Sequence, residues 1–193
     1  MDLTQGTEKE KNNRAKKMML WFGIISLIMS FAGWTSAFVV SSSRPDWLKD
    51  FVLPNAFIIS TVVMVLSSIS FILAKKELKK GNNKAVTLWL FITLILGVVF
   101  IFNQFTGFQN IIDLGYNFTG PTSNVTMSYI YLIAIVHILH VVVGLICLLV
   151  VIYNHFKQKY NPTRTLGFEL AATFWHFIDI LWVYLFLFLY FIR

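Results

Sequence analysis

Five long apolar runs restrict what this chain can fold into more than any other feature of its sequence. Each run is 21 to 26 residues long, and about 20 apolar residues suffice for a helix to cross the ~30 Å hydrocarbon layer of a membrane. The runs lack the alternation that is typical of membrane β-barrel strands. The sequence therefore predicts an all-α integral membrane protein, a bundle of five transmembrane helices. We expect these helices at about 18–40, 53–74, 85–105, 127–152 and 170–192.

Composition excludes several other classes of protein. Hydrophobic residues make up 57% of the chain and charged residues only 13%, whereas soluble domains carry about 25% charged residues. The single Cys excludes a disulfide framework and a Cys-rich metal site. The first apolar run is too long for a secretory signal and lacks a clear cleavage site, so we expect it to be retained. The chain then divides into a tail, 1–17, and one membrane domain, 18–193.

Basic residues alternate in number between successive connections and so predict the orientation. In chain order the six segments outside the apolar runs hold 5, 2, 5, 0, 3 and 1 Lys or Arg, which gives 13 on one side and 3 on the other. The positive-inside rule then places the tail 1–17 in the cytoplasm and the C-terminus outside. This distribution explains the net charge of +7 without a nucleic-acid partner, since no binding motif accompanies it. It also suits contact with anionic lipids.

Small residues recur on one face of the first predicted helix, with spacings of 3, 4, 3 and 4. Such residues let a second helix approach closely in a membrane. The favoured interpretation is packing within the bundle of this chain, and the alternative is a docking face for a separate, larger subunit. The residues of this small-residue face are Gly23, Ser26, Ser30, Gly33 and Ala37.

Polar and aromatic residues within the fourth and fifth runs are the candidate functional residues, because ionisable groups inside a membrane usually have a function. Two Trp lie too deep in the fifth run to be interface anchors alone and are expected to line the bundle or a lipid crevice. We expect the others to form a buried polar cluster. The candidates are His137, His140, Glu169, Trp175, His176, Asp179 and Trp182.

Asp179 should face protein rather than lipid, because a charge at the bilayer centre costs about 2.5–3.5 kcal/mol. His140 lies at a matching depth in the fourth helix. We therefore predict a direct or water-bridged hydrogen bond between them, with His176 close by, in a cluster that locks the fourth and fifth helices together. Two alternatives are less favoured. One is a metal or haem site, for which the sequence offers too few ligands. The other is a complete proton relay across the membrane, for which the first three helices offer no buried acid or base.

Four segments, in order, resemble the cytochrome c oxidase subunit III family. The most specific is in the fifth helix, which begins LGFE at 166–169 and continues TFWHFIDILW at 173–182. The fourth helix contributes HILHVVVG at 137–144 and the third LGVVFIFNQ at 96–104. The second contributes SSIS at 67–70. His137, His140, Glu169, His176, Asp179 and Trp182 all match the family pattern.

The chain also departs from that pattern. Long members of the family have seven helices, so the resemblance is to the short five-helix bacterial form. Leu27 stands where the family usually has an intramembrane Glu, and Gly107-Phe108 replaces an expected Glu-Tyr pair. Any role that rests on those acids is not expected here.

The resemblance implies an accessory subunit of a haem-copper terminal oxidase in the bacterial inner membrane. Such a subunit packs against subunit I, with subunit II and other oxidase subunits in the complex. It binds phospholipids and supports proton uptake. The complex, a cytochrome c or quinol oxidase, reduces dioxygen to water and pumps protons. This chain is then a non-catalytic part of an enzyme, without haem or copper of its own; both belong to partner subunits.

Two other functions are alternatives to this one. A subunit III-like protein of a nitric oxide reductase system would share the same motifs. An independent proton-coupled transporter is disfavoured, because transporters often show inverted repeats and broken helices, and this sequence has five unbroken runs and no visible repeat.

Overall fold

The computed structural model describes residues 6–48, 53–120, 123–160 and 165–192. Every named element in these ranges is a helix, and all five helices are long and apolar enough to cross a membrane. The predicted all-helical membrane fold is therefore confirmed. Lys49, Arg164 and Arg193, which enter the charge count, lie outside the described residues. The helices are α1 (Glu8–Ser41), α2 (Asn55–Lys79), α3 (Asn83–Asp113), α4 (Val125–Phe156) and α5 (Leu166–Phe191).

Two helices are clearly longer than their apolar runs. α1 begins at Glu8, inside the predicted tail, because a capping box fixes its start: the Thr7 amide donates to Glu10 Oε2 (2.9 Å), and the Glu10 amide donates to Thr7 Oγ1 (3.4 Å). Its 34 residues span about 51 Å, more than the ~30 Å hydrocarbon layer. α3 likewise continues to Asp113. Hydropathy therefore predicts the membrane-spanning part of a helix, not where the helix begins and ends.

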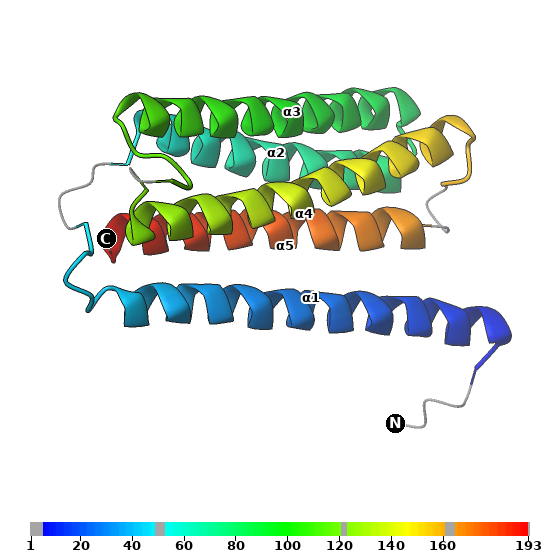
Figure 1. Cartoon of the computed structure of the whole chain (residues 1–193). Helices are drawn as coiled ribbons and strands as arrows, with labels where there is room; N and C mark the ends of the chain where they lie inside the picture. The colour runs from blue at the N-terminus through cyan, green and yellow to red at the C-terminus, as the bar shows by residue number, and fades with distance from the viewer. Residues whose placement is uncertain (1–5, 49–52, 121–122, 161–164, 193) are drawn as a thin grey trace.

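The order of helices in space differs from their order in the chain. α2 and α3 form the most closely associated antiparallel pair, and α5 packs against both α2 and α4. α1 lies along one side of the bundle (Figure 1), where it contacts α4 and α5 but neither α2 nor α3. Part of the surface of α5 therefore lies between α1 and α2, which do not contact each other.

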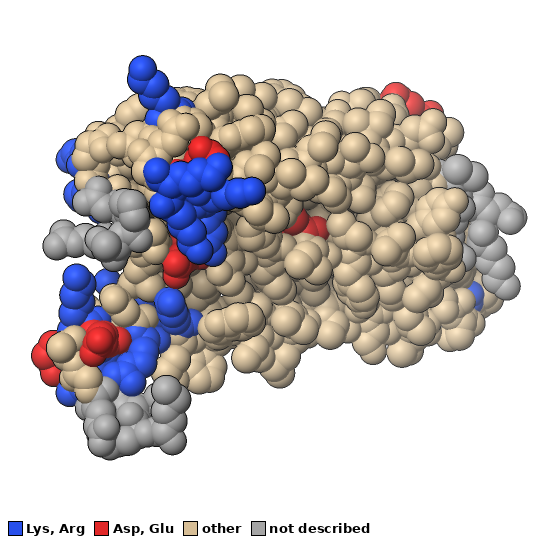
Figure 2. Space-filling model, turned by 180° about the vertical axis from the view of Figure 1, so that it is seen from behind, with Lys and Arg blue, Asp and Glu red and all other residues tan. Residues whose placement is uncertain are grey.

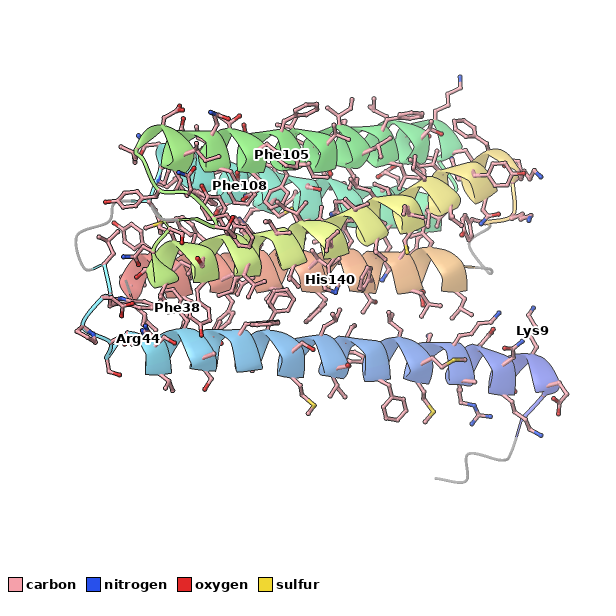
Figure 3. The ribbon with its side chains drawn as sticks, viewed as in Figure 1. Lys9, Phe38, Arg44, Phe105, Phe108 and His140 are labelled. Atoms are coloured by element: carbon pink, nitrogen blue, oxygen red, sulfur yellow. The ribbon has the colours of Figure 1, made fainter. Side chains whose placement is uncertain are left out.

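Charged side chains gather at the ends of the bundle and leave an apolar girdle between them, which one small acidic patch interrupts on the face shown in Figure 2. Most lysines lie at the end formed by the start of α1, the α2–α3 turn and the beginning of the α4–α5 connection; we call it the basic end. Figure 3 shows Lys9 at this end and Arg44 at the opposite end. The described lysines of the basic end include Lys9, Lys17, Lys75, Lys84 and Lys159.

Candidate functional site

Two buried indoles join α5 to α2. Trp175 Nε1 donates to the Ser67 hydroxyl and Trp182 Nε1 donates to the Thr61 hydroxyl, each over 3.1 Å. Both Trp side chains are only 1% exposed. They therefore line the bundle interior, one of the two places expected for them, and the hydroxyls of α2 satisfy their polar atoms as burial requires.

Glycines make room for the Trp175 ring between α3 and α4. A Cβ at Gly97 would lie 2.9 Å from Trp175 Cη2, and one at Gly144 would lie 3.1 Å from Trp175 Cε3. Real Cβ atoms do not approach heavy atoms as closely as the first of these distances. The glycines in the LGVVF and HVVVG motifs are thus explained by the close approach of one indole.

His176 and Asp179 lie on the α2 side of α5. His176 Nδ1 and the Ser68 hydroxyl form a hydrogen bond of 2.7 Å. Asp179 is 3% exposed, and neither of its carboxyl oxygens has a hydrogen-bond partner among the described residues.

The two histidines of α4 have different surroundings. His137 is fully buried among aromatic rings, with centroid distances of 5.0 Å to Trp182 and 5.9 Å to Phe100, and neither ring nitrogen has a partner within the described ranges. His140 Nδ1 bonds to the carbonyl of Val136, one turn earlier in its own helix, over 2.7 Å. Its ring also meets Phe31 of α1 edge-on.

These positions correct the predicted cluster. The prediction of a direct hydrogen bond between His140 and Asp179 is wrong, since the carboxyl oxygens of Asp179 have no partner among the described residues. A water-bridged contact between them stays a prediction. The side-chain hydrogen bonds of Trp175, His176 and Trp182 run to α2 rather than to α4. The physical reason is that α2 offers short hydroxyl side chains to α5, whereas α4 offers Gly144 and His137, which pack on the indoles without bonding to them.

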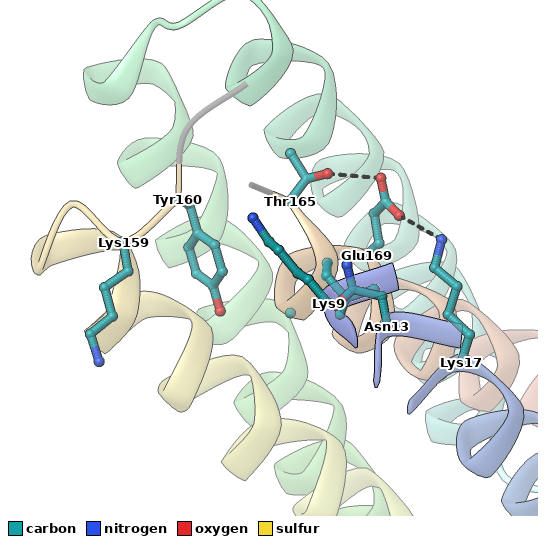
Figure 4. A pocket seen from close by; sticks show the side chains of 9 residues that line it. Lys9, Asn13, Lys17, Lys159, Tyr160, Thr165 and Glu169 are labelled. Carbon is teal, nitrogen blue, oxygen red and sulfur yellow. Dashed lines mark hydrogen bonds and ion pairs between the residues drawn. The ribbon is translucent and has the colours of Figure 1, made fainter. Parts of the chain in front are cut away.

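Glu169 belongs to the basic end of the bundle rather than to its middle. Its carboxylate accepts a hydrogen bond from Thr165 Oγ1 (2.9 Å) and pairs with Lys17 Nζ of α1 (3.5 Å), as Figure 4 shows. Lys9 and Lys159 line the same cavity of about 400 Å³. The arrangement ties the end of α1 to α5 and leaves a cavity with a predominantly basic rim.

An apolar groove lies next to that cavity. It has a volume of about 480 Å³, runs between α1, α4 and α5, and includes Leu20, Cys147 and Phe174 in its lining. Tyr160 and Gly167 border both spaces. A polar cavity and an apolar groove thus lie next to each other along one side of the molecule.

The small-residue face of α1 points away from the bundle. Gly23, Ser26, Ser30 and Gly33 are exposed and Ala37 is half-buried, and a Cβ at Gly23 or Gly33 would meet no atom within 4 Å. The favoured interpretation, packing within this chain, is therefore wrong. α1 packs instead through larger side chains one or two positions away from this stripe, which fill the space that small residues would leave empty: Ile24, Phe31, Thr35 and Phe38.

Sequence reasoning missed several residues of this interior. Thr61 is the partner of Trp182, and only its place on the α2 face that carries the serines could have suggested this. Gln104 of α3 ends the LGVVFIFNQ motif, but the sequence did not predict its burial. It is 0% exposed, and both amide atoms lack a partner in the described part of the chain. Over the same described residues, no three His, Cys, Asp or Glu side chains gather closely enough to hold a metal ion.

Comparison with known proteins identifies the family. The family model described as "Cytochrome c oxidase subunit III" matches residues 4–193. The cytochrome bo(3) ubiquinol oxidase subunit 3 of Buchnera aphidicola is 36% identical over 138 residues, which cover 70% of this chain and 69% of that protein. The cytochrome c oxidase subunit 3 of Alkalihalophilus pseudofirmus is 31% identical over 71% of this chain and 66% of its own length. That of Felis catus is 31% identical over 86% of this chain and 66% of its own length. The chain belongs to the cytochrome c oxidase subunit III family.

Proposed function

We propose that this chain is an accessory subunit of a proton-pumping haem-copper terminal oxidase, without a redox centre of its own. The observation that carries the proposal is the family match over nearly the whole chain, together with relatives that are named as subunit 3 of cytochrome c and ubiquinol oxidases. The described interior is compatible with it, because Trp175 and Trp182 bond to hydroxyls and His137 packs against an aromatic ring. Its role is to stabilise subunit I, hold lipids at their interface and support proton uptake.

Deletion of this chain tests the accessory role. The haem spectrum of the remaining oxidase should be unchanged, because the haems and copper lie on other subunits. Activity should begin near normal and decay during turnover, or the complex should assemble poorly, since an apolar flank of subunit I loses its cover. A loss of haem absorbance from an otherwise assembled complex would show that this chain carries a cofactor and would refute the proposal.

The paired cavity and groove beside α1 are the proposed lipid site. An acyl chain would fill the apolar groove, and an anionic phosphate headgroup would lie in the cavity beside Lys9 and Lys159. Each basic residue near a headgroup contributes about 1 kcal/mol. In the purified complex, Lys9→Gln/Lys159→Gln should reduce the anionic phospholipid retained, as measured by mass spectrometry. Lys84→Gln, a surface control outside both spaces, should not; equal retention in both would contradict the site.

The proposed location is the bacterial inner membrane, with the basic end in the cytoplasm. The proposal follows from the 13-to-3 division of basic residues and the positive-inside rule. An alkaline phosphatase reporter fused after the C-terminus should be active, because that enzyme folds only outside the cytoplasm. An active cytoplasmic reporter at the same position would reverse the orientation.

A further inference from the structure

Asp179 is the acidic residue that the architecture leaves least explained. It lies in the apolar girdle, 3% exposed, and forms neither an ion pair nor a hydrogen bond with any described residue. An isolated carboxylate in such surroundings is costly, and a neutral carboxylic acid is much less so. A neutral acid at this depth can exchange its proton with water only along a path of polar groups or water molecules.

One flank of α5 connects Asp179 to the basic end. Glu169, Thr173, His176 and Asp179 follow one another at spacings of 4, 3 and 3, which places them on one helix face. The first three are half-buried and the last is buried. We call this set the α5 seam. It lies between α1 and α2, which both pack on α5 without contacting each other.

The outer half of the α5 seam opens into a cavity. This cavity has a volume of about 210 Å³, and Lys17 and Trp21 of α1, Lys75 of α2 and Glu169 and Thr173 of α5 contribute to its lining. Its lining is mainly polar, and a volume of this size holds several water molecules. Water from the basic end can therefore reach as far as Thr173, one turn from His176.

His176 and Ser68 continue the polar path inward. Their hydrogen bond of 2.7 Å joins α5 to α2, one turn before Asp179. Imidazole and hydroxyl groups both donate and accept hydrogen bonds, so each can take up a proton on one side and release one on the other.

Beyond Asp179 the path is closed by aromatic rings. Trp182, the next turn of α5, stacks on Phe57 with a centroid distance of 6.2 Å and meets Phe100 edge-on at 5.1 Å. All three side chains are at most 2% exposed. A polar path through the whole bundle would dissipate the proton gradient that an oxidase builds, and this layer prevents that.

We infer that the α5 seam is a one-sided, water-filled path through which Asp179 takes up and releases a proton at the basic end. The proton passes from water to the Asp179 carboxylate by way of His176 and Ser68, forms the neutral acid, and leaves by the same route. The inference deepens the proposed support of proton uptake. The titratable groups on the helices packed around this face are Lys17 of α1, Lys75 of α2, His137 and His140 of α4, and Glu169 and His176 of α5.

Infrared spectroscopy of the full chain in lipid bilayers tests this inference. A protonated carboxyl gives a C=O stretching band that moves to lower frequency in D₂O. Wild-type protein should show this band, and Asp179→Asn should lack it. After transfer to D₂O the band should shift promptly in the wild type and at least about tenfold more slowly in His176→Phe, a barrier increase of about 1.4 kcal/mol.

His140→Phe is the matched control, because it makes the same change in a neighbouring helix but off the α5 seam. Its exchange rate should equal that of the wild type, and Ser68→Ala should be slow like His176→Phe. The inference is overturned if Asp179→Asn removes only ionised-carboxylate bands, or if His176→Phe and Ser68→Ala both exchange at the wild-type rate. The measurement needs no oxidase partner. The proton path at Asp179 can therefore be refuted while the accessory role stands, and the accessory role can be refuted while the proton path stands.

Discussion

Gly97→Ala is the substitution whose effect follows most directly from the packing. The added Cβ would lie 2.8 Å from Leu145 Cδ2 and 2.9 Å from Trp175 Cη2. The leucine methyl can rotate away. The indole cannot move as easily, because Ser67 holds its Nε1 and the Gly144 backbone lies close to its other edge. The new methyl group therefore meets a ring that is already held on two sides.

The size of the effect follows from a matched control. Overpacking of a well-packed core costs about 1–3 kcal/mol, while Gly→Ala within a helix gains up to about 1 kcal/mol from helix propensity. Gly33→Ala in α1 carries the same propensity gain, and its Cβ would meet no atom within 4 Å. The difference in unfolding free energy between the two variants should thus be about 1–3 kcal/mol, with Gly97→Ala the less stable.

The assay is a titration of the full chain from mild detergent into SDS, with helical circular dichroism as the signal. Trp175→Phe removes the edge that the new methyl meets, so Gly97→Ala should cost less in that background; the coupling should fall within the usual range of about 0.5–3 kcal/mol for residues in contact. Equal stability of Gly97→Ala and Gly33→Ala, or zero coupling with Trp175, would refute this account of the packing.

Three further outcomes are expected. Trp182→Phe loses the bond to Thr61 and should destabilise the chain in the same assay by about 0.6 kcal/mol, at most about 1.7 kcal/mol, beyond its packing loss; no coupling with Thr61→Val would contradict the bond. Glu169→Gln should change stability by less than about 1 kcal/mol, because its ion pair is partly exposed. The Arg44 guanidinium holds the pKa of Asp46 below its usual range, so the Arg44–Asp46 attraction is present at neutral pH and is lost as pH falls through that lowered pKa. Arg44→Gln should let the Asp46 pKa rise, as carbon NMR of the carboxyl would show; an unchanged value would exclude the pair as its cause.

Hydropathy was enough to predict the number of helices and their approximate positions. It could not predict that α1 begins at Glu8, because the segment before Met18 is charged and its helix depends on the capping box at Thr7. It also could not predict which helices touch. α1 and α2 follow one another yet make no contact, whereas α2 and α5 pack together across the bundle.

In the candidate site, the sequence predicts the depth of a residue in the membrane better than the direction in which its side chain points. Residue spacing correctly assigned His176 and Asp179 to one helix face. It placed His140 at a suitable depth for Asp179, but the rotation of α4 about its axis turns that ring to Phe31 and to the carbonyl of its own helix. Rotation is decided by packing of all neighbours at once, and a single sequence carries only part of that information. The partners of the indoles, Ser67 and Thr61, depend on the same rotation.

The most direct test of the central claim is purification of the tagged chain from its native membrane in mild detergent. The co-purified material should give a reduced-minus-oxidised haem spectrum and should consume dioxygen when supplied with an electron donor. Both results follow if this chain is an accessory subunit of a haem-copper oxidase. Recovery of the chain with no haem protein, or with a complex that reduces nitric oxide but not dioxygen, would contradict the account.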